Sequence, residues 1–162
     1  MEAFALPGAG AIIERVVEGQ LHILMQSRDK VGAPNERGLL EIPAGKVRAF
    51  ESIFDCLRRE VKEETGLEVI EILGEGQSPA VEQHGYRALS FQPFSCTQNL
   101  AGSYPIMVMV FICRVHGDAL SESDESKQIH WMPLAELSAK LEQHPEAFYP
   151  MHLTTLRKYA AM

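Results

Sequence analysis

The segment from Gly45 to Leu67 reads GKVRAFESIFDCLRREVKEETGL and ends in a cluster of acidic side chains. Glu60, Glu63 and Glu64 fall at positions i, i+3 and i+4, so a helix would bring them onto one face. Like charges this close repel one another unless a cation lies between them. Carboxylate oxygens are the ligands that Mg²⁺ and similar hard ions prefer. The segment therefore predicts a helix that holds a divalent metal ion.

The helix itself is predicted over about residues 52–65. Ser52 is a suitable N-cap, and Gly66 is placed to end the helix in the left-handed conformation that glycine adopts without strain. Apolar residues recur at helical spacing and should face the core, with the acids pointing the other way. These apolar positions are Ile53, Leu57, Val61 and Phe54.

The spacing of this segment resembles the Nudix box, G-x5-E-x7-R-E-U-x-E-E-x-G-U, where U is an aliphatic residue, at every fixed position. The resemblance implies the Nudix fold, an α/β/α sandwich built on a mixed β-sheet, with a core over about residues 5–140. The length of the chain suggests one domain, a single Nudix hydrolase domain over residues 1–162, and a final helix is predicted at about 151–160. The family acts on nucleoside diphosphates linked to another group, using Mg²⁺ or Mn²⁺.

The resemblance assigns roles to the acids of the box. Glu60 and Glu64 are expected to bind the metal, and Glu63 either joins them or orients the attacking water. The main-chain carbonyl of Gly45 is a further candidate ligand, because a glycine allows close approach of the backbone. A solvated acidic helix face is the plain alternative for an isolated pattern of this kind.

A second implied feature is an ion pair between Arg59 and Glu51. It would clamp the loop to the helix and so place the metal ligands. The alternative is a surface salt bridge of little energetic value.

A further carboxylate is expected in the loop before the strand that ends at Trp131. Some Nudix enzymes carry there a metal ligand or general base, and Glu125 is the first candidate, with Asp124 second. The alternative is an ordinary polar turn, in which Ser, Asp and Glu are common.

The implied reaction is attack of water on a phosphorus of a diphosphate bridge, with a carboxylate as base. Residues 39–46, LLEIPAGK, are similar to the entry to the box in ADP-ribose and nucleotide-sugar pyrophosphatases, which favours those substrates. Arg28 and Arg87 are candidates for phosphate contact, or else surface arginines. Two alternatives stay open: a MutT-like house-cleaning pyrophosphatase of (deoxy)nucleoside triphosphates, and a non-catalytic module that senses a nucleotide.

Composition narrows the class of protein. The chain has 162 residues, a formal net charge of −7 and a sequence pI near 5.4. An acidic balance argues against general binding to nucleic-acid phosphates, which needs basic patches. No secretory signal or membrane span is recognisable, so a cytoplasmic protein is expected. Relatives commonly dimerise, which makes a homodimer possible.

The remaining elements are predicted from hydrophobic pattern and turn residues. The three cysteines are expected to be buried free thiols. The six histidines are expected to be ordinary surface residues, with a place lining a cleft as the alternative for His84 and His130. A helix is expected to start at Pro133, and loops at 28–38, 74–86 and 95–105. The predicted strands are 9–17, 21–27, 39–42, 67–73, 86–94, 106–115 and 129–132.

Overall fold

The computed structural model describes residues 1–102 and 104–162 and is built around three long strands. Strands β1 (Leu6–Val17) and β2 (Gln20–Arg28) form an antiparallel hairpin, and β9 (Ile106–His116) lies parallel to β1. The principal sheet has the order β10-β2-β1-β9-β5 and therefore contains both parallel and antiparallel pairs. This confirms the predicted mixed sheet.

Shorter strands and the helices complete the structure. The strands are β3 (Leu40–Glu41), β4 (Ala44–Lys46), β5 (Glu68–Ile72), β6 (Ala80–Gln83), β7 (Tyr86–Leu89), β8 (Ser95–Gln98) and β10 (Ser126–Pro133). The α-helices are α1 (Ile53–Thr65), α2 (Leu134–Gln143) and α3 (Pro150–Ala160), and short 3-10 turns occur at Pro34–Glu36, Glu75–Gln77 and Pro145–Ala147.

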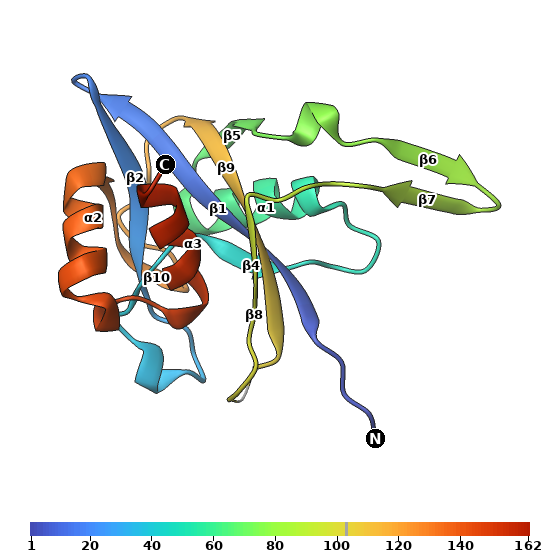
Figure 1. Ribbon diagram of the computed structural model, residues 1–162, viewed down its shortest axis with the longest axis horizontal. Helices are drawn as coiled ribbons and strands as arrows, with labels where there is room; N and C mark the ends of the chain where they lie inside the picture. The colour runs from blue at the N-terminus through green and yellow to red at the C-terminus, as the bar shows by residue number, and fades with distance from the viewer. Residues whose placement is uncertain (103) are drawn as a thin grey trace.

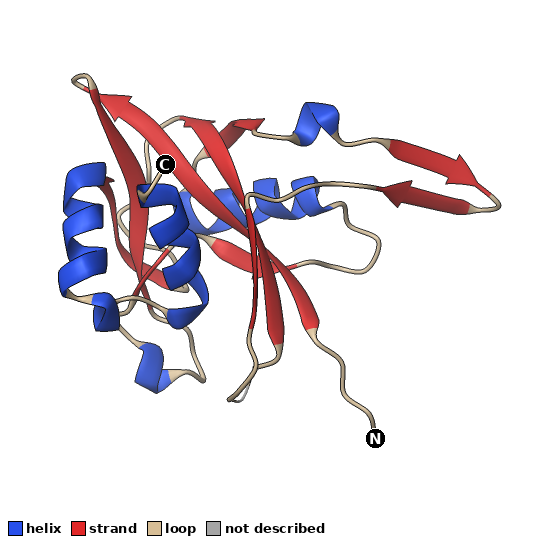
Figure 2. Ribbon diagram, in the orientation of Figure 1, coloured by secondary structure: helices blue, strands red, loops and turns tan. Residues whose placement is uncertain are grey.

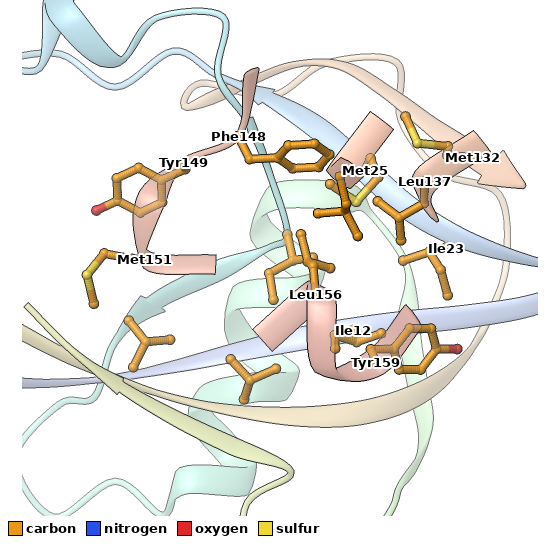
Figure 3. Close-up of a cluster of buried hydrophobic side chains, with 14 of the residues drawn as sticks. Ile12, Ile23, Met25, Met132, Leu137, Phe148, Tyr149, Met151, Leu156 and Tyr159 are labelled. Atoms are coloured by element: carbon orange, nitrogen blue, oxygen red, sulfur yellow. The ribbon is translucent and has the colours of Figure 1, made fainter. Parts of the chain in front are cut away.

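The two faces of the sheet are covered by different helices, as Figures 1 and 2 show. Successive side chains of a strand point to opposite faces. Along β1, Ala11 and Ile13 therefore pack with α1, whereas Ile12 packs with α2 and α3. Figure 3 shows part of the hydrophobic cluster that lies between the sheet and helices α2 and α3. In it, Leu137 of α2 and Leu156 of α3 lie against residues of β1 and β2. The result is the expected α/β/α sandwich.

Helix α1 forms where its local sequence predicts. The Ser52 hydroxyl accepts a hydrogen bond from the Asp55 amide at 3.0 Å, and Gly66 ends the helix with φ 77°. The four apolar positions predicted to face the core are buried. One expectation was wrong, because not every acid points away from the core: Glu64 is only 4% exposed.

The region from residue 74 to 98 differs from the prediction of one strand over 86–94. Strand β7 ends at Leu89 and pairs with β6 in a separate two-stranded sheet, which projects from the body of the molecule in Figure 1. His84 and Gly85 both have positive φ, 51° and 80°, as tight hairpin turns require. Strand β8, within a predicted loop, pairs with β9.

The cysteines are free, as expected, and Cys56 and Cys113 are buried. Cys96 is exposed, contrary to expectation, because it lies on the short strand β8, where alternate residues face solvent. No helix within the described residues is long and apolar enough to cross a membrane.

Candidate functional site

The acidic end of α1 faces a cavity of about 1060 Å³. Its other walls are residues 44–48, which include β4, the segments 28–36 and 123–125, residues 104–108 at the start of β9, and the start of α3. Between β3, which pairs with β2, and β4, which pairs with β1, the chain crosses from one strand of the hairpin to the other. This crossing brings the glycine end of the box under the acidic face of α1.

Glu64 is the buried acid of the cavity. Its Oε2 accepts a hydrogen bond from the Ala44 amide at 2.9 Å, whereas its Oε1 is buried and has no hydrogen-bond partner among residues 1–102 and 104–162. Burial raises the pKa of this carboxyl well above its usual value. Such a carboxyl is neutral by protonation unless a bound cation takes the place of the proton and stabilises its charge.

Glu60 lies directly against Gly45. A Cβ added to Gly45 would lie 2.0 Å from Cδ of Glu60, so only glycine leaves room for this carboxylate. The backbone of Gly45 is in turn fixed by pairing with Ala9 of β1. The glycine is therefore needed for the close approach of the Glu60 side chain, and its φ is not positive, so the expected special backbone turn at Gly45 is not the reason for it.

Arg59 holds the loop before α1 in place. Its Nε donates to Glu51 Oε2 at 2.8 Å and its Nη2 to Glu51 Oε1 at 2.9 Å, a two-point contact. A third bond goes to the Lys46 carbonyl at 3.1 Å. The hydrogen bonds from Arg59 lower the pKa of Glu51 to about 2. The ion pair implied by the resemblance is therefore present, and it ties the loop to both α1 and β4.

The same guanidinium also contacts acids of the predicted metal face. Nη1 of Arg59 lies 2.6 Å from Glu60 Oε1 and 3.5 Å from Glu63 Oε2, and the Glu63 side chain is 55% exposed. No three His, Cys, Asp or Glu side chains within residues 1–102 and 104–162 are gathered closely enough to form a metal site as they stand. The carboxylate oxygens of these acids still suit a hard divalent ion, and Oε1 of Glu64 is an oxygen that no hydrogen-bond donor of the described residues occupies.

The loop before β10 also reaches the cavity. Asp124 and Glu125 both line it, and Glu125 Oε2 lies 3.6 Å from Nζ of Lys30. The Glu125 side chain is 55% exposed. The structure thus places both candidate carboxylates at the cavity, and the role of either stays a prediction.

The two candidate arginines have different surroundings. Arg28 lines the cavity but is only 8% exposed, so the alternative of a surface arginine was wrong for it. Its guanidinium contacts Glu36 at 2.6 Å and Glu41 at 2.7 Å. Arg87 lies on the projecting hairpin, 86% exposed and paired with Glu82, and does not line the cavity.

Several cavity residues were missed by sequence reasoning, among them the cationic Lys30, Lys46 and Arg48, and Tyr149 and His152 at the start of α3. The Tyr149 ring lies under the guanidinium of Arg28, with Cζ 3.9 Å from its centroid. His152 is 1% exposed, whereas a surface position was expected for the histidines. Its only local signal is its place one helical turn ahead of the buried Leu156, on the apolar stripe of a predicted helix.

Comparison with known proteins places the fold in one family. The family model described as NUDIX domain matches residues 6–152. No curated protein sequence matches the chain.

Several solved structures share the architecture. The NUDIX domain of Shewanella oneidensis NrtR, complexed with ADP ribose, is 15% identical with a TM-score of 0.68, over 99% of this chain and 89% of that one. The MutT protein of Methanosarcina mazei is 20% identical with a TM-score of 0.63, over 99% and 96% of the two chains. A Caenorhabditis elegans Ap4A hydrolase is 18% identical with a TM-score of 0.57, over 97% and 96%.

Identities this low establish the likeness of fold alone, whereas the family model covers nearly the whole chain. Its span includes every strand of the principal sheet and the acidic helix α1. The chain therefore belongs to the Nudix family of hydrolases, enzymes that act on diphosphate bonds.

Proposed function

We propose that the protein is a metal-dependent pyrophosphohydrolase that cleaves a nucleoside diphosphate linked to another moiety, with ADP-ribose or a nucleotide sugar favoured. The observation that carries the proposal is Glu64, a buried carboxylate with one oxygen anchored to the Ala44 amide and the other unpaired beside a large cavity. Without a cation or a proton, a buried carboxylate in this state is strongly disfavoured.

Glu60, Glu63 and Glu64, with the carbonyl of Gly45, would hold Mg²⁺ or Mn²⁺. When bound, the ion lowers the pKa of its water and neutralises charge on the phosphate oxygens. Glu63 is the exposed member of the set, so in place of binding the ion it is a candidate to orient the attacking water and accept its proton. Glu125, at the opposite loop, is the second candidate for this role.

The choice of substrate rests on two points of support. The residues entering the box, 39–46, are similar to those of ADP-ribose and nucleotide-sugar pyrophosphatases, and one structural neighbour was solved with ADP ribose. Cationic side chains at the cavity suit a diphosphate, which carries negative charge on both phosphates. Lys30, Lys46 and Arg48 supply them.

The test is hydrolysis of a nucleotide panel in Mg²⁺, with and without EDTA. The panel contains ADP-ribose, nucleotide sugars and (deoxy)nucleoside triphosphates. Monophosphate should be released from the diphosphate-linked compounds, and Glu64→Gln should lower the rate on the order of a hundredfold or more, as misplaced catalytic groups do.

Glu68→Gln is the matched control, because Glu68 is an exposed acid of β5 that pairs with Lys62 away from the cavity. Preference for triphosphates would replace the substrate assignment with the MutT-like one. Tight binding of a nucleotide without cleavage would replace the enzyme with the sensing module.

A further inference from the structure

His152 lies in the first turn of α3 with its imidazole fully inside the protein. Its Nδ1 is 3.2 Å from the Ile42 amide nitrogen, and an amide N–H can only donate. Nδ1 must therefore be the accepting nitrogen, and the proton of the neutral ring is on Nε2. Burial lowers the pKa of His152 to about 3, so the ring is neutral at ordinary pH.

The N–H at Nε2 has no hydrogen-bond partner within the described part of the chain, although the atom is buried and the residue lines the cavity. A buried donor without a partner costs about 1–3 kcal/mol. The cost is relieved when something in the cavity offers an acceptor. His152 thus differs from a core histidine that has both nitrogens satisfied by the protein.

The imidazole is also held rigidly. Tyr149 packs against it edge to face, with ring centroids 5.1 Å apart, and Arg28 stacks on Tyr149. Arg28 is itself fixed by two carboxylates. Because the ring cannot swing to another partner without losing the Ile42 amide, its N–H is a preoriented donor.

His152 and Glu64 line the same cavity. They are anchored to the backbone amides of Ile42 and Ala44, whose nitrogens are two residues apart along the chain and so no more than about 7 Å from each other. A single small molecule in the cavity can therefore lie against both residues.

The chemistry of the donor selects the part of the ligand. A neutral N–H can donate to a phosphate oxygen or to a neutral acceptor, but the cavity already has cationic side chains for the phosphates. That leaves a neutral acceptor as its partner, such as a carbonyl oxygen, a ring nitrogen or a sugar oxygen. The N–H also rejects an amino group at the same point, because it cannot accept a hydrogen bond.

We propose that His152 is a specificity-determining residue whose Nε2–H donates to a neutral acceptor on the nucleoside half of the substrate. The inference rests on the proposed function, because it assumes that the phosphates of the same ligand are held at the acidic end of α1.

Two substitutions separate the two nitrogens. His152→Asn keeps an acceptor near the position of Nδ1, for the Ile42 amide, and removes the donor at Nε2. His152→Gln places an N–H near the position of Nε2 and removes the acceptor at Nδ1. His144→Asn is the matched control, because His144 is 62% exposed and lies outside the cavity.

Binding is measured by calorimetric titration in Mg²⁺ with AMP, GMP, CMP, UMP and ribose 5-phosphate, none of which contains a diphosphate to cleave. His152→Asn should weaken the best-bound nucleoside monophosphate about 3- to 10-fold, as the loss of one hydrogen bond does, and leave ribose 5-phosphate unchanged. His152→Gln should recover nucleotide affinity while melting at a lower temperature. His144→Asn should behave as the wild type.

Equal nucleotide affinity of His152→Asn and the wild type would overturn the inference and assign His152 a purely structural role. So would equal weakening of ribose 5-phosphate, or absence of wild-type binding to all four monophosphates. A wild type that binds a monophosphate in a His152-dependent way but hydrolyses nothing in the panel would keep this inference and reject the proposed hydrolase.

Discussion

Replacement of His152 by Asn should remove a specific part of the pH dependence of stability. The pKa of His152 is about 3 in the folded protein, against an ordinary value near 6.5. Between these values the unfolded chain binds a proton that the folded protein does not, so the free energy of unfolding falls as the pH falls. The contribution is complete above about pH 6.5 and is lost on acidification toward pH 3.

The size follows from the same two values. Each pH unit in this window is worth about 1.4 kcal/mol, and the loss between pH 7.5 and pH 4.5 is about 2.7 kcal/mol for a group with these pKa values. Other groups titrate over the same range, among them Glu64, whose raised pKa acts in the opposite direction. The difference between variant and wild type cancels those contributions.

The assay is urea unfolding at pH 7.5 and pH 4.5 for the wild type, His152→Asn and the control His144→Asn. Between pH 7.5 and pH 4.5, the free energy of unfolding of the wild type and of the control should fall by about 2–3 kcal/mol more than that of His152→Asn. An identical loss in all three proteins would refute the reasoning, because it would mean that the folded state protonates His152 as readily as the unfolded chain.

Three other changes test the framework of the site. Gly45→Ala should lower the rate of hydrolysis at least tenfold, because a Cβ 2.0 Å from Glu60 Cδ must displace that carboxylate. Glu51→Gln should remove up to about 3 kcal/mol of acid-sensitive stability, seen by urea unfolding: with Arg59 the folded pKa of Glu51 is about 2, so its contribution is complete above about pH 4.5 and lost toward pH 2. Phe50→Gly should raise the free energy of unfolding by about 0.5–1 kcal/mol in thermal unfolding, because this fully exposed residue has φ 64°.

Each change has a control. Gly76→Ala adds a Cβ where no atom lies within 4 Å and should leave the rate unchanged, and an equal loss there would contradict the steric argument. Glu68→Gln replaces an exposed acid. It should keep the fall in the free energy of unfolding between about pH 4.5 and pH 2, which Glu51→Gln should lose. Phe50→Ala keeps a side chain at positive φ, so stabilisation equal to that of Phe50→Gly would exclude backbone strain as the cause.

The sequence was most informative where structure is set locally. The caps of α1, Ser52 and Gly66, and its apolar stripe follow from side-chain chemistry over a few residues, and all were confirmed. The burial of Glu64 could also have been found, because it lies seven residues after Leu57 and three after Val61, on the buried stripe of the helix. Its charge suggested exposure, and the packing of α1 against the sheet decided otherwise.

What the sequence could not predict depends on distant contacts. The hydrogen bond from the Ile42 amide to His152 links residues that are 110 positions apart in the sequence, and no local sequence pattern predicts it. Strand β8 forms because β9 offers it an edge. The turn residues His84 and Gly85 could have predicted the hairpin of β6 and β7. The sequence did not predict that this hairpin forms a sheet of its own, separate from the principal sheet.

The most direct test of the central claim is the hydrolysis of ADP-ribose by the purified protein in Mg²⁺, followed as release of AMP. The proposal predicts AMP in Mg²⁺, none in EDTA, and a rate reduced on the order of a hundredfold or more in Glu64→Gln, with Glu68→Gln as active as the wild type. Release of AMP by Glu64→Gln at the wild-type rate would contradict it, because the buried, unpaired carboxylate would then have no part in the reaction.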